Sequence, residues 1–339
     1  MGGVQSRKGE ESKLKYLKYF LAILQSFLLP MNTFITVIIS VSLLSISAVS
    51  VQAAEGGYSN YIPGTYGDFA AAVEPPSKFT LRNDIYHYQA DGGKSARSGL
   101  IEADADLEIN MNLLTLLYKP DVEVFGAHYG FGALVTIVDL DIDAGIRLGG
   151  LSVRRQDDVV GLGDITLIPG ILFWNSGNYH FTLAEYIVTP TANYDSDDLA
   201  NAGLNYWTFD TNVAATYLNT ETGQDYSINI GYIYNTENSD TDYQTGQELH
   251  IDYMINQFLS EAWAIGIQGY YLKQVTGDSG DGATLGDFKA EATGIGPAVL
   301  LDTKFGDQGV SLIAKWIHEF HADNRMEGDH VFLSFAMGF

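Results

Sequence analysis

Cysteine, long apolar runs and positive charge are all scarce in this sequence. Cysteine is absent from all 339 residues, which excludes disulfide frameworks, thiolate zinc sites and cysteine nucleophiles. After residue 54 no apolar run approaches the roughly 18 residues that a membrane-spanning helix needs, so a helical membrane protein is not expected. The 18 Lys and Arg against 42 Asp and Glu give a net charge of −24. Such a field repels phosphate, so nucleic acid is not expected as a partner.

Aromatic residues and glycine are plentiful instead. The chain contains 21 Tyr, 17 Phe and 36 Gly, and only 18% of its residues are charged. Aromatic side chains favour strands, and glycine favours the turns between them. The composition is therefore typical of many strands joined by turns and not of a helix bundle.

The first 53 residues have the order of an export leader. Basic residues between 7 and 18 precede two apolar stretches, 19–29 and 34–51, and Val51-Gln52-Ala53 resembles a small-x-small processing site. We predict cleavage after Ala53 or Ala54, so that residues 1–53 are a signal peptide. The alternative is a retained membrane-anchoring helix. A start at Met31 would give a shorter leader without the basic region.

Alternation with a period of two continues to the last residue. Between 104 and 113, Ala105 and Leu107 lie on one parity with Ile109, while acidic and amide side chains occupy the other. The final ten residues set Val331 and Phe339 on an apolar parity in the same way. This period predicts strands with one apolar face. Twelve strands are expected, at roughly 78–90, 104–113, 122–141, 160–174, 178–190, 204–218, 226–235, 249–255, 261–275, 286–301, 309–320 and 330–339.

The connections between these strands alternate in length. The odd ones look long, at 90–99, 142–159, 191–203, 236–243, 276–285 and 321–329, and the even ones look short, at 119–121, 175–177, 219–223, 259–260 and 302–308. Outer-membrane barrels pair long extracellular loops with short periplasmic turns in this way. We therefore predict an all-β fold: residues 78–339 form a transmembrane antiparallel up-and-down β-barrel of about 12 strands in the bacterial outer membrane.

Two further expectations accompany the barrel. Residues 54–77 form a segment containing glycine and proline that is periplasmic or lumenal. The alternative to the barrel is a soluble secreted β-sandwich, which would also show short strands and turn signals.

If the apolar parity faces lipid, the charged parity faces the lumen. The residues predicted to line it are Arg82, Asp104, Asp106, Glu108, Asp210, Asp225, Glu248, His250, Asp252, Lys289, Glu291 and Lys315. Such a lumen is wet and acidic and disfavours anions, unless the charges pair across a narrow barrel and fill it.

Glu185 is an exception to the pattern. It lies on the otherwise apolar parity of Phe181 and Leu183, where a carboxylate facing lipid is costly. The sequence leaves two interpretations open: an opening in the barrel wall at Glu185, or a bulge or register shift.

Motifs that resemble catalytic or metal sites fail on spacing. His318 and His321 are three residues apart, whereas the metalloprotease helix needs four. Asp139, Asp141 and Asp143 resemble a calcium loop, but Gly150 stands where the bidentate Glu belongs. We expect no catalytic residue, no cofactor and no metal. The rivals to a channel are a phospholipase-like barrel enzyme, which needs a His and Ser pair on the lipid-facing rim, and a structural or adhesive barrel.

Several short motifs, in order along the chain, resemble a known family. They include Gly161-x-Gly163-Asp164-x-Thr166, Gly177-Asn178-x-His180-Phe181, Asn205-Tyr206-Trp207-Thr208 and Gly294-x-Gly296-Pro297. Together they resemble the outer-membrane channels of the meta-pathway phenol-degradation family. The resemblance implies a twelve-stranded barrel that takes up small hydrophobic or aromatic molecules passively. The expected partners are outer-membrane lipid, the solute, and the outer-membrane assembly machinery through the strand ending at Phe339.

Overall fold

A computed structural model describes residues 54–339, except 58, 97–100, 149–150, 284–288 and 307. The predicted leader and its cleavage bond therefore lie outside the described residues. The described part contains fourteen antiparallel strands, one short 3₁₀ helix, η2 (Glu55–Gly57), and the connections between them. No helix in it is long and apolar enough to cross a membrane. The strands are β1 (Phe79–Ala96), β2 (Ile101–Tyr118), β3 (Glu123–Val124), β4 (Ala127–Leu148), β5 (Leu151–Leu162), β6 (Ile165–Ser176), β7 (Tyr179–Thr189), β8 (Thr208–Asn219), β9 (Gln224–Asn235), β10 (Glu248–Phe258), β11 (Trp263–Gln274), β12 (Glu291–Phe305), β13 (Gln308–Asp323) and β14 (Glu327–Gly338).

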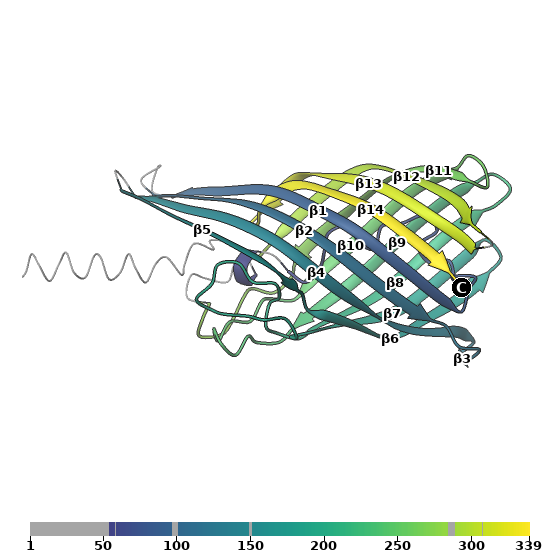
Figure 1. Cartoon of the computed structure of the whole chain (residues 1–339), viewed down its shortest axis with the longest axis horizontal. Coiled ribbons are helices and arrows are strands. Elements are labelled where there is room, and N and C mark those ends of the chain that lie inside the picture. Colours follow the sequence, from purple (N-terminus) through teal and green to yellow (C-terminus); the bar gives the residue numbers. More distant parts are fainter. Residues whose placement is uncertain (1–53, 58, 97–100, 149–150, 284–288, 307) are drawn as a thin grey trace, which may run out of the picture. The chain divides into compact units, whose positions relative to one another are not determined.

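The sheet closes on itself as a barrel (Figure 1). The first strand pairs with the last, from Thr80 opposite Gly338 to Asp91 opposite Glu327. Strand β2 pairs with β4, and the remaining strands follow in chain order. The prediction of twelve barrel strands is confirmed: they are β1, β2, β4 and β6 to β14, while β3 and β5 are additional.

Alternation along the strands separates the two faces of the wall. In β9, Tyr226, Ile228 and Ile230 are between 40% and 46% exposed on the outside. On the other parity, Asp225 and Asn229 are buried on the inside. Closure gives each of the twelve barrel strands a paired neighbour on both sides, which is what a sheet needs to cross a lipid layer.

Two of the connections predicted to be loops are strands instead. Strand β1 continues through most of 90–99, to Ala96, with β2 beginning at Ile101. Strands β4 and β5 occupy most of 142–159 as a paired hairpin, with Leu140 opposite Val159. These four strands reach beyond the others at one end of the barrel (Figure 1). We call this the loop end, because the long connections β7–β8, β9–β10 and β11–β12 are there; the opposite end is the turn end.

Residues 54–77 run through the inside of the barrel, and we call them the lumenal segment. At the loop end, the Ala54 amide donates to Asp278 in the β11–β12 connection (3.2 Å). Nearer the turn end, the Ala72 amide donates to Thr216 Oγ1 of β8 (2.9 Å). At the turn end, Glu74 pairs with Lys119, which directly follows β2. The segment thus contacts the wall from one end of the barrel to the other.

Candidate functional site

The inner face of β8 to β10 carries a buried polar cluster. His250 is fully buried, and its Nε2 lies 3.1 Å from Asp210 Oδ1 while its Nδ1 lies 3.2 Å from Asp252 Oδ2. Buried carboxylates need such partners because an unpaired charge inside a protein is costly.

Two tyrosines of the lumenal segment bind to this cluster. The Tyr61 hydroxyl donates to Asp252 (3.0 Å), and the Tyr66 hydroxyl donates to Asp210 (2.7 Å). The Tyr61 ring also stacks on His250, with 4.1 Å between ring centroids. Hydroxyl and ring contacts together fix the segment against one side of the wall.

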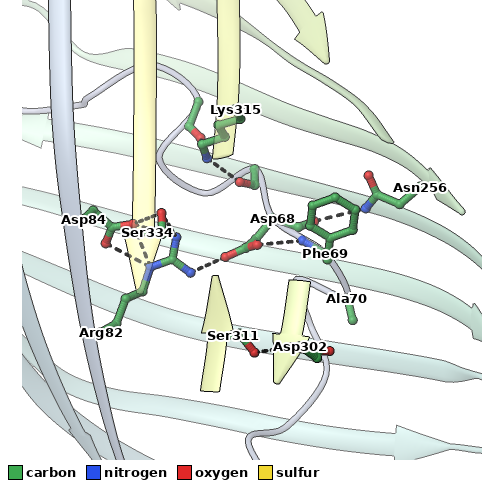
Figure 2. Close-up of polar contacts among 12 residues, drawn as sticks. Asp68, Phe69, Ala70, Arg82, Asp84, Asn256, Asp302, Ser311, Lys315 and Ser334 are labelled. Carbon is green, nitrogen blue, oxygen red and sulfur yellow. Dashed lines mark hydrogen bonds and ion pairs between the residues drawn. The ribbon is translucent and has the colours of Figure 1, made fainter. Parts of the chain in front are cut away.

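A turn at residues 64–70 is held by two cations of the opposite wall (Figure 2). Lys315 Nζ donates to the carbonyl oxygens of Gly64 (2.6 Å) and Gly67. Arg82 pairs with Asp68 of the turn and with Asp84 of its own strand (2.8 Å). Both cations are on strands next to the seam where β1 meets β14.

The end of the turn is held from the other side. The Ala70 amide donates to Asp225 Oδ2 (2.6 Å), and Asn256 donates to the same oxygen (2.7 Å). The Phe69 ring enters an apolar cluster on β11 to β13 with Ala264, Ala298, Leu300 and Ile313.

A cavity of about 350 Å³ remains between the lumenal segment and the wall formed by β2, β4, β6 and β7. Its wall side is mainly apolar. The residues there include Met111, Leu113, Leu117, Leu134, Val138 and Ile168. The segment side supplies polar groups from Tyr66 and Asp68, and Arg82 and Asp210 complete the polar edge. An apolar surface with a few convergent polar groups is the usual form of a small-molecule site.

The wall next to this cavity is bulged. The β6–β7 register shifts between Leu167 and Gly170, so Pro169 interrupts the ladder. Ile168 and Ile171 face the cavity, whereas Pro169 and Gly170 border an outer groove of about 410 Å³. Glu185 also borders this groove. One bulged strand therefore separates the inner cavity from the outer groove.

Glu185 is on the outer face of β7, opposite Gly170 of the bulged strand. Its carboxylate accepts a hydrogen bond from Thr211 (2.6 Å). The parity of β7 is unbroken, so the register irregularity lies in the neighbouring strand β6 and not at Glu185 itself.

A hollow of about 730 Å³ lies on the outer surface over β9 to β14. Outward-facing residues such as Ile267, Trp316 and Leu333 form most of its lining. In a membrane, lipid chains would fill such a groove, so its size does not make it the functional site.

Seven of the twelve residues predicted to face the lumen are inside the barrel. They are Arg82, Asp210, Asp225, Glu248, His250, Asp252 and Lys315. Six of them contact the lumenal segment or the cluster that holds it, and Glu248 is buried beside them. Their charges are thus largely occupied by contacts within the protein.

The prediction is wrong for Asp104, Asp106 and Glu108. They lie on the outside of the extended part of β2, where Arg154 of β5 pairs with Asp104 (2.7 Å) and Asp106 (2.9 Å). The inward positions there are Ala105, Leu107 and Ile109, which are buried. Beyond the lipid the outside of a sheet meets water, so its charged parity faces outward, as in a soluble protein.

The prediction is also wrong for Lys289 and Glu291. Lys289 is in the β11–β12 connection and donates to the Val275 carbonyl oxygen (3.2 Å). Glu291 begins β12 on its outer parity and pairs with Lys273 (2.9 Å). Both are at the loop end, where outward-facing positions meet water and not lipid. Charged residues on the outward parity are therefore no exception there.

Sequence reasoning missed the segment's own contributions, above all Tyr61, Tyr66 and Asp68. Residues 54–77 have no strand or helix period, so nothing in the pattern says which side chains point at the wall. The only local signal is the mixture of tyrosine and glycine, which is also typical of an ordinary linker.

The described residues were compared with the metal and catalytic motifs of the sequence. No group of three or more His, Asp or Glu there is arranged to hold a metal ion. His318 is on the outer face, where its Nδ1 lies 3.0 Å from Asp329 Oδ1, and the Trp316 indole donates to the same oxygen (2.8 Å).

Comparison with known proteins gives one family. One protein family carries the description "MetA-pathway of phenol degradation". The sequence model of this family matches residues 87–335, which are most of the chain. The chain belongs to this family. This phenol-degradation family member matches no curated protein sequence.

Among solved structures, the family member is similar to the outer membrane channel of Pseudomonas putida F1. The TM-score is 0.59 at 17% identity, over 82% of this chain and 99% of the channel. A FadL homologue from Pseudomonas aeruginosa gives a TM-score of 0.41 at 9% identity, over 84% of this chain and 96% of that one. The first comparison establishes a shared outer-membrane barrel fold, and at this identity it establishes the fold alone.

Proposed function

We propose that the protein is a passive channel of the bacterial outer membrane that takes up small apolar or aromatic molecules. The observation that carries this proposal is the apolar inner wall of the cavity. Porins for water-soluble solutes have polar interiors, whereas Met111, Leu113 and Leu117 face inward here. Apolar surface facing a lumen favours a solute that loses hydration when it binds.

The negative charge of the protein also bears on the charge of the solute. At the cavity edge Asp68 pairs with Arg82 and Asp210 lies 3.1 Å from His250, but the chain as a whole has a net charge of −24. A neutral or cationic molecule is therefore favoured over an anion. The proposed route enters at the loop end, which is extracellular under the long-loop rule, and continues into the cavity.

For release, we propose the wall beside Glu185. The β6 bulge separates the cavity from the outer groove, since Ile168 faces one and Pro169 the other. A ladder already interrupted at Pro169 loses fewer hydrogen bonds on opening than a regular one.

Flux into proteoliposomes tests the proposal. Leu113 lines the cavity, whereas its neighbour Leu114 is 44% exposed on the outer face. We expect Leu113→Trp to fill part of the cavity and reduce the uptake of a phenol-sized aromatic by about tenfold. Leu114→Trp adds the same bulk toward lipid and should leave uptake unchanged. Equal uptake in both variants, or none in the wild type, would contradict the proposal.

The enzymatic rival has a separate readout. A phospholipase-like barrel would depend on His318, the histidine on the outer rim. We expect His318→Ala to change neither aromatic flux nor any lipase signal in the same vesicles.

A further inference from the structure

The lumenal segment begins at a buried carboxylate. The Ala54 nitrogen lies 3.2 Å from Asp278 Oδ2, and Asp278 is only 6% exposed. Three neutral groups also donate to this carboxylate: the Tyr243 hydroxyl (2.6 Å), the Gly246 amide (2.9 Å) and Gln274 Nε2 (2.6 Å). Among the ion pairs of the described residues, none involves Asp278. A buried carboxylate at this site is suited to a cation.

The residues that follow Ala54 are also bound at the loop end. The Glu55 amide donates to Thr245 Oγ1 (3.2 Å). The Glu55 carboxylate accepts hydrogen bonds from Thr241 (2.6 Å) and Asn238 (2.9 Å). The backbone direction is thus fixed, with the Ala54 nitrogen directed at Asp278.

The topology limits what can precede Ala54. Its nitrogen is at the loop end, whereas an export leader acts at the inner membrane, on the turn-end side of an inserted barrel. A leader that is still attached would therefore have to pass through the lumen that the segment itself fills. Cleavage must precede closure of the barrel around residues 54–77.

The backbone at Ala54 is strained while residue 53 is attached. Its φ is +66°, in the left-handed region that a residue with a Cβ rarely adopts. This torsion is defined only while residue 53 is attached. Removal of residue 53 ends the constraint and converts an amide with one hydrogen into an ammonium group with three.

We propose that the chain is processed between Ala53 and Ala54, and that the new α-ammonium group of Ala54 forms a buried ion pair with Asp278 that fixes the lumenal segment at the extracellular mouth. The step is a peptide hydrolysis: water adds across the Ala53–Ala54 bond, giving a carboxylate on the leader and an amine on Ala54. An α-amine is cationic at neutral pH because its ordinary pKa is about 8. Cleavage one residue later would remove the group that pairs.

The processing bond is tested on the full-length gene product expressed in a Gram-negative host. Intact mass and amino-terminal sequencing of protein extracted from outer membranes should show Ala54 as the first residue. A chain beginning at Glu55, or one that retains any part of residues 1–53, would overturn the proposal. This readout is independent of transport, so it can fail while the channel proposal stands.

The ion pair is tested by the reactivity of the α-amine toward an acylating reagent at neutral pH, read by peptide mass mapping. In the folded wild type we expect labelling about tenfold slower than in the heat-unfolded protein. Asp278→Asn should remove most of this protection, whereas Asp281→Asn, an exposed residue of the same connection, should keep it. Tyr243→Phe removes one neutral donor but keeps the charge, so protection should remain within about twofold. An α-amine that reacts equally fast in folded and unfolded wild type would refute the pair.

Discussion

Arg82 joins the lumenal segment to the wall through two carboxylates. The Arg82 side chain is 25% exposed, and those of Asp68 and Asp84 are 17% and 14% exposed. Loss of the guanidinium would leave two partly buried carboxylates without their cation. Such a loss costs more than the pair itself contributes, because the remaining charges stay desolvated.

Arg82→Gln should therefore loosen the turn at 64–70. We expect the local opening free energy of this turn to fall by about 2 kcal/mol. Hydrogen exchange should then accelerate by about 30-fold at the turn amides, with Gly67 as the reporter because its amide is hydrogen bonded (3.1 Å). Arg154→Gln is the control, since Arg154 is 46% exposed on the outer face and surface pairs contribute less than about 1 kcal/mol. Unchanged exchange in Arg82→Gln would refute this role of Arg82.

Glu74 anchors the segment at the turn end. Its carboxylate pairs with Lys119, lies 2.7 Å from His128 Nδ1 and accepts a hydrogen bond from Asn175 (2.9 Å). Burial by itself would raise the pKa of Glu74, but the hydrogen bonds from Lys119 and His128 outweigh it and lower the pKa. The folded protein thus favours the charged form more than the unfolded chain does.

The pH dependence of this anchor follows from the lowered pKa. Its stabilisation is present above the ordinary glutamate pKa of about 4.3 and is lost as the pH falls through the lowered value. We expect the ion conductance of bilayers containing the protein to rise below about pH 4 as the anchor is released. Glu74→Gln should show part of this rise already at pH 7, whereas Glu123→Gln, 68% exposed beside the same histidine, should not. Identical conductance of wild type and Glu74→Gln at pH 7 would contradict the anchor.

At the scale of elements, the most irregular strand is β6. Its pairing is shifted on both sides, against β4 between Gly130 and Gly132 and against β7 between Leu167 and Gly170. These register shifts cost backbone hydrogen bonds that a regular barrel strand keeps. The opening that we propose in the wall would account for this loss, with Glu185 of the adjacent strand as a polar group on the outside of the bulge.

The substitution Glu185→Leu should change the stability of the barrel and its transport of solute in opposite directions. Removing a carboxylate from the lipid-facing side should stabilise the barrel by about 1 kcal/mol, measured by urea unfolding in lipid vesicles. Flux of a small aromatic should fall several-fold if the wall opens there. Glu221→Leu, an exposed residue in a short turn, should alter neither quantity by much. A variant that is both more stable and fully active would refute the opening at Glu185.

The sequence predicted the elements well wherever both faces of a strand have fixed surroundings. In β9 the outer face meets lipid and the inner face meets the polar cluster. The alternation of Tyr226 and Asp225 in the sequence therefore agrees with the sides on which they lie. In β2 the surroundings change along the strand: Leu114 faces lipid, but Asp106 on the same parity faces water. Parity alone cannot show where the lipid ends, and for this reason the extensions of β1, β2, β4 and β5 were expected as loops.

At the scale of the whole molecule, the barrel and the lumenal segment act as one unit. The segment bonds to β8 through Thr216, to β9 through Asp225 and to β13 through Lys315. Each bond spans more than one hundred residues of sequence. Such contacts depend on the fold that brings distant residues together, so the local pattern of residues 54–77 does not predict them.

Replacing residues 59–73 by a flexible Gly/Ser linker of equal length tests this unity. The barrel should still form, because its pairing does not include the segment. Ion conductance should increase by about tenfold, since a twelve-stranded barrel emptied of its contents leaves a continuous bore. Conductance equal to that of the wild type would show that the segment does not close the lumen.

The most direct test of the account is to locate a bound solute. Crystals of the protein soaked with bromobenzene, measured at the bromine absorption edge, would reveal the ligand by its anomalous scattering. We predict a bromine peak in the cavity between the lumenal segment and Leu113, Leu134 and Ile168. Bromine found only in the outer groove near Ile267 and Trp316, with the cavity empty, would contradict it.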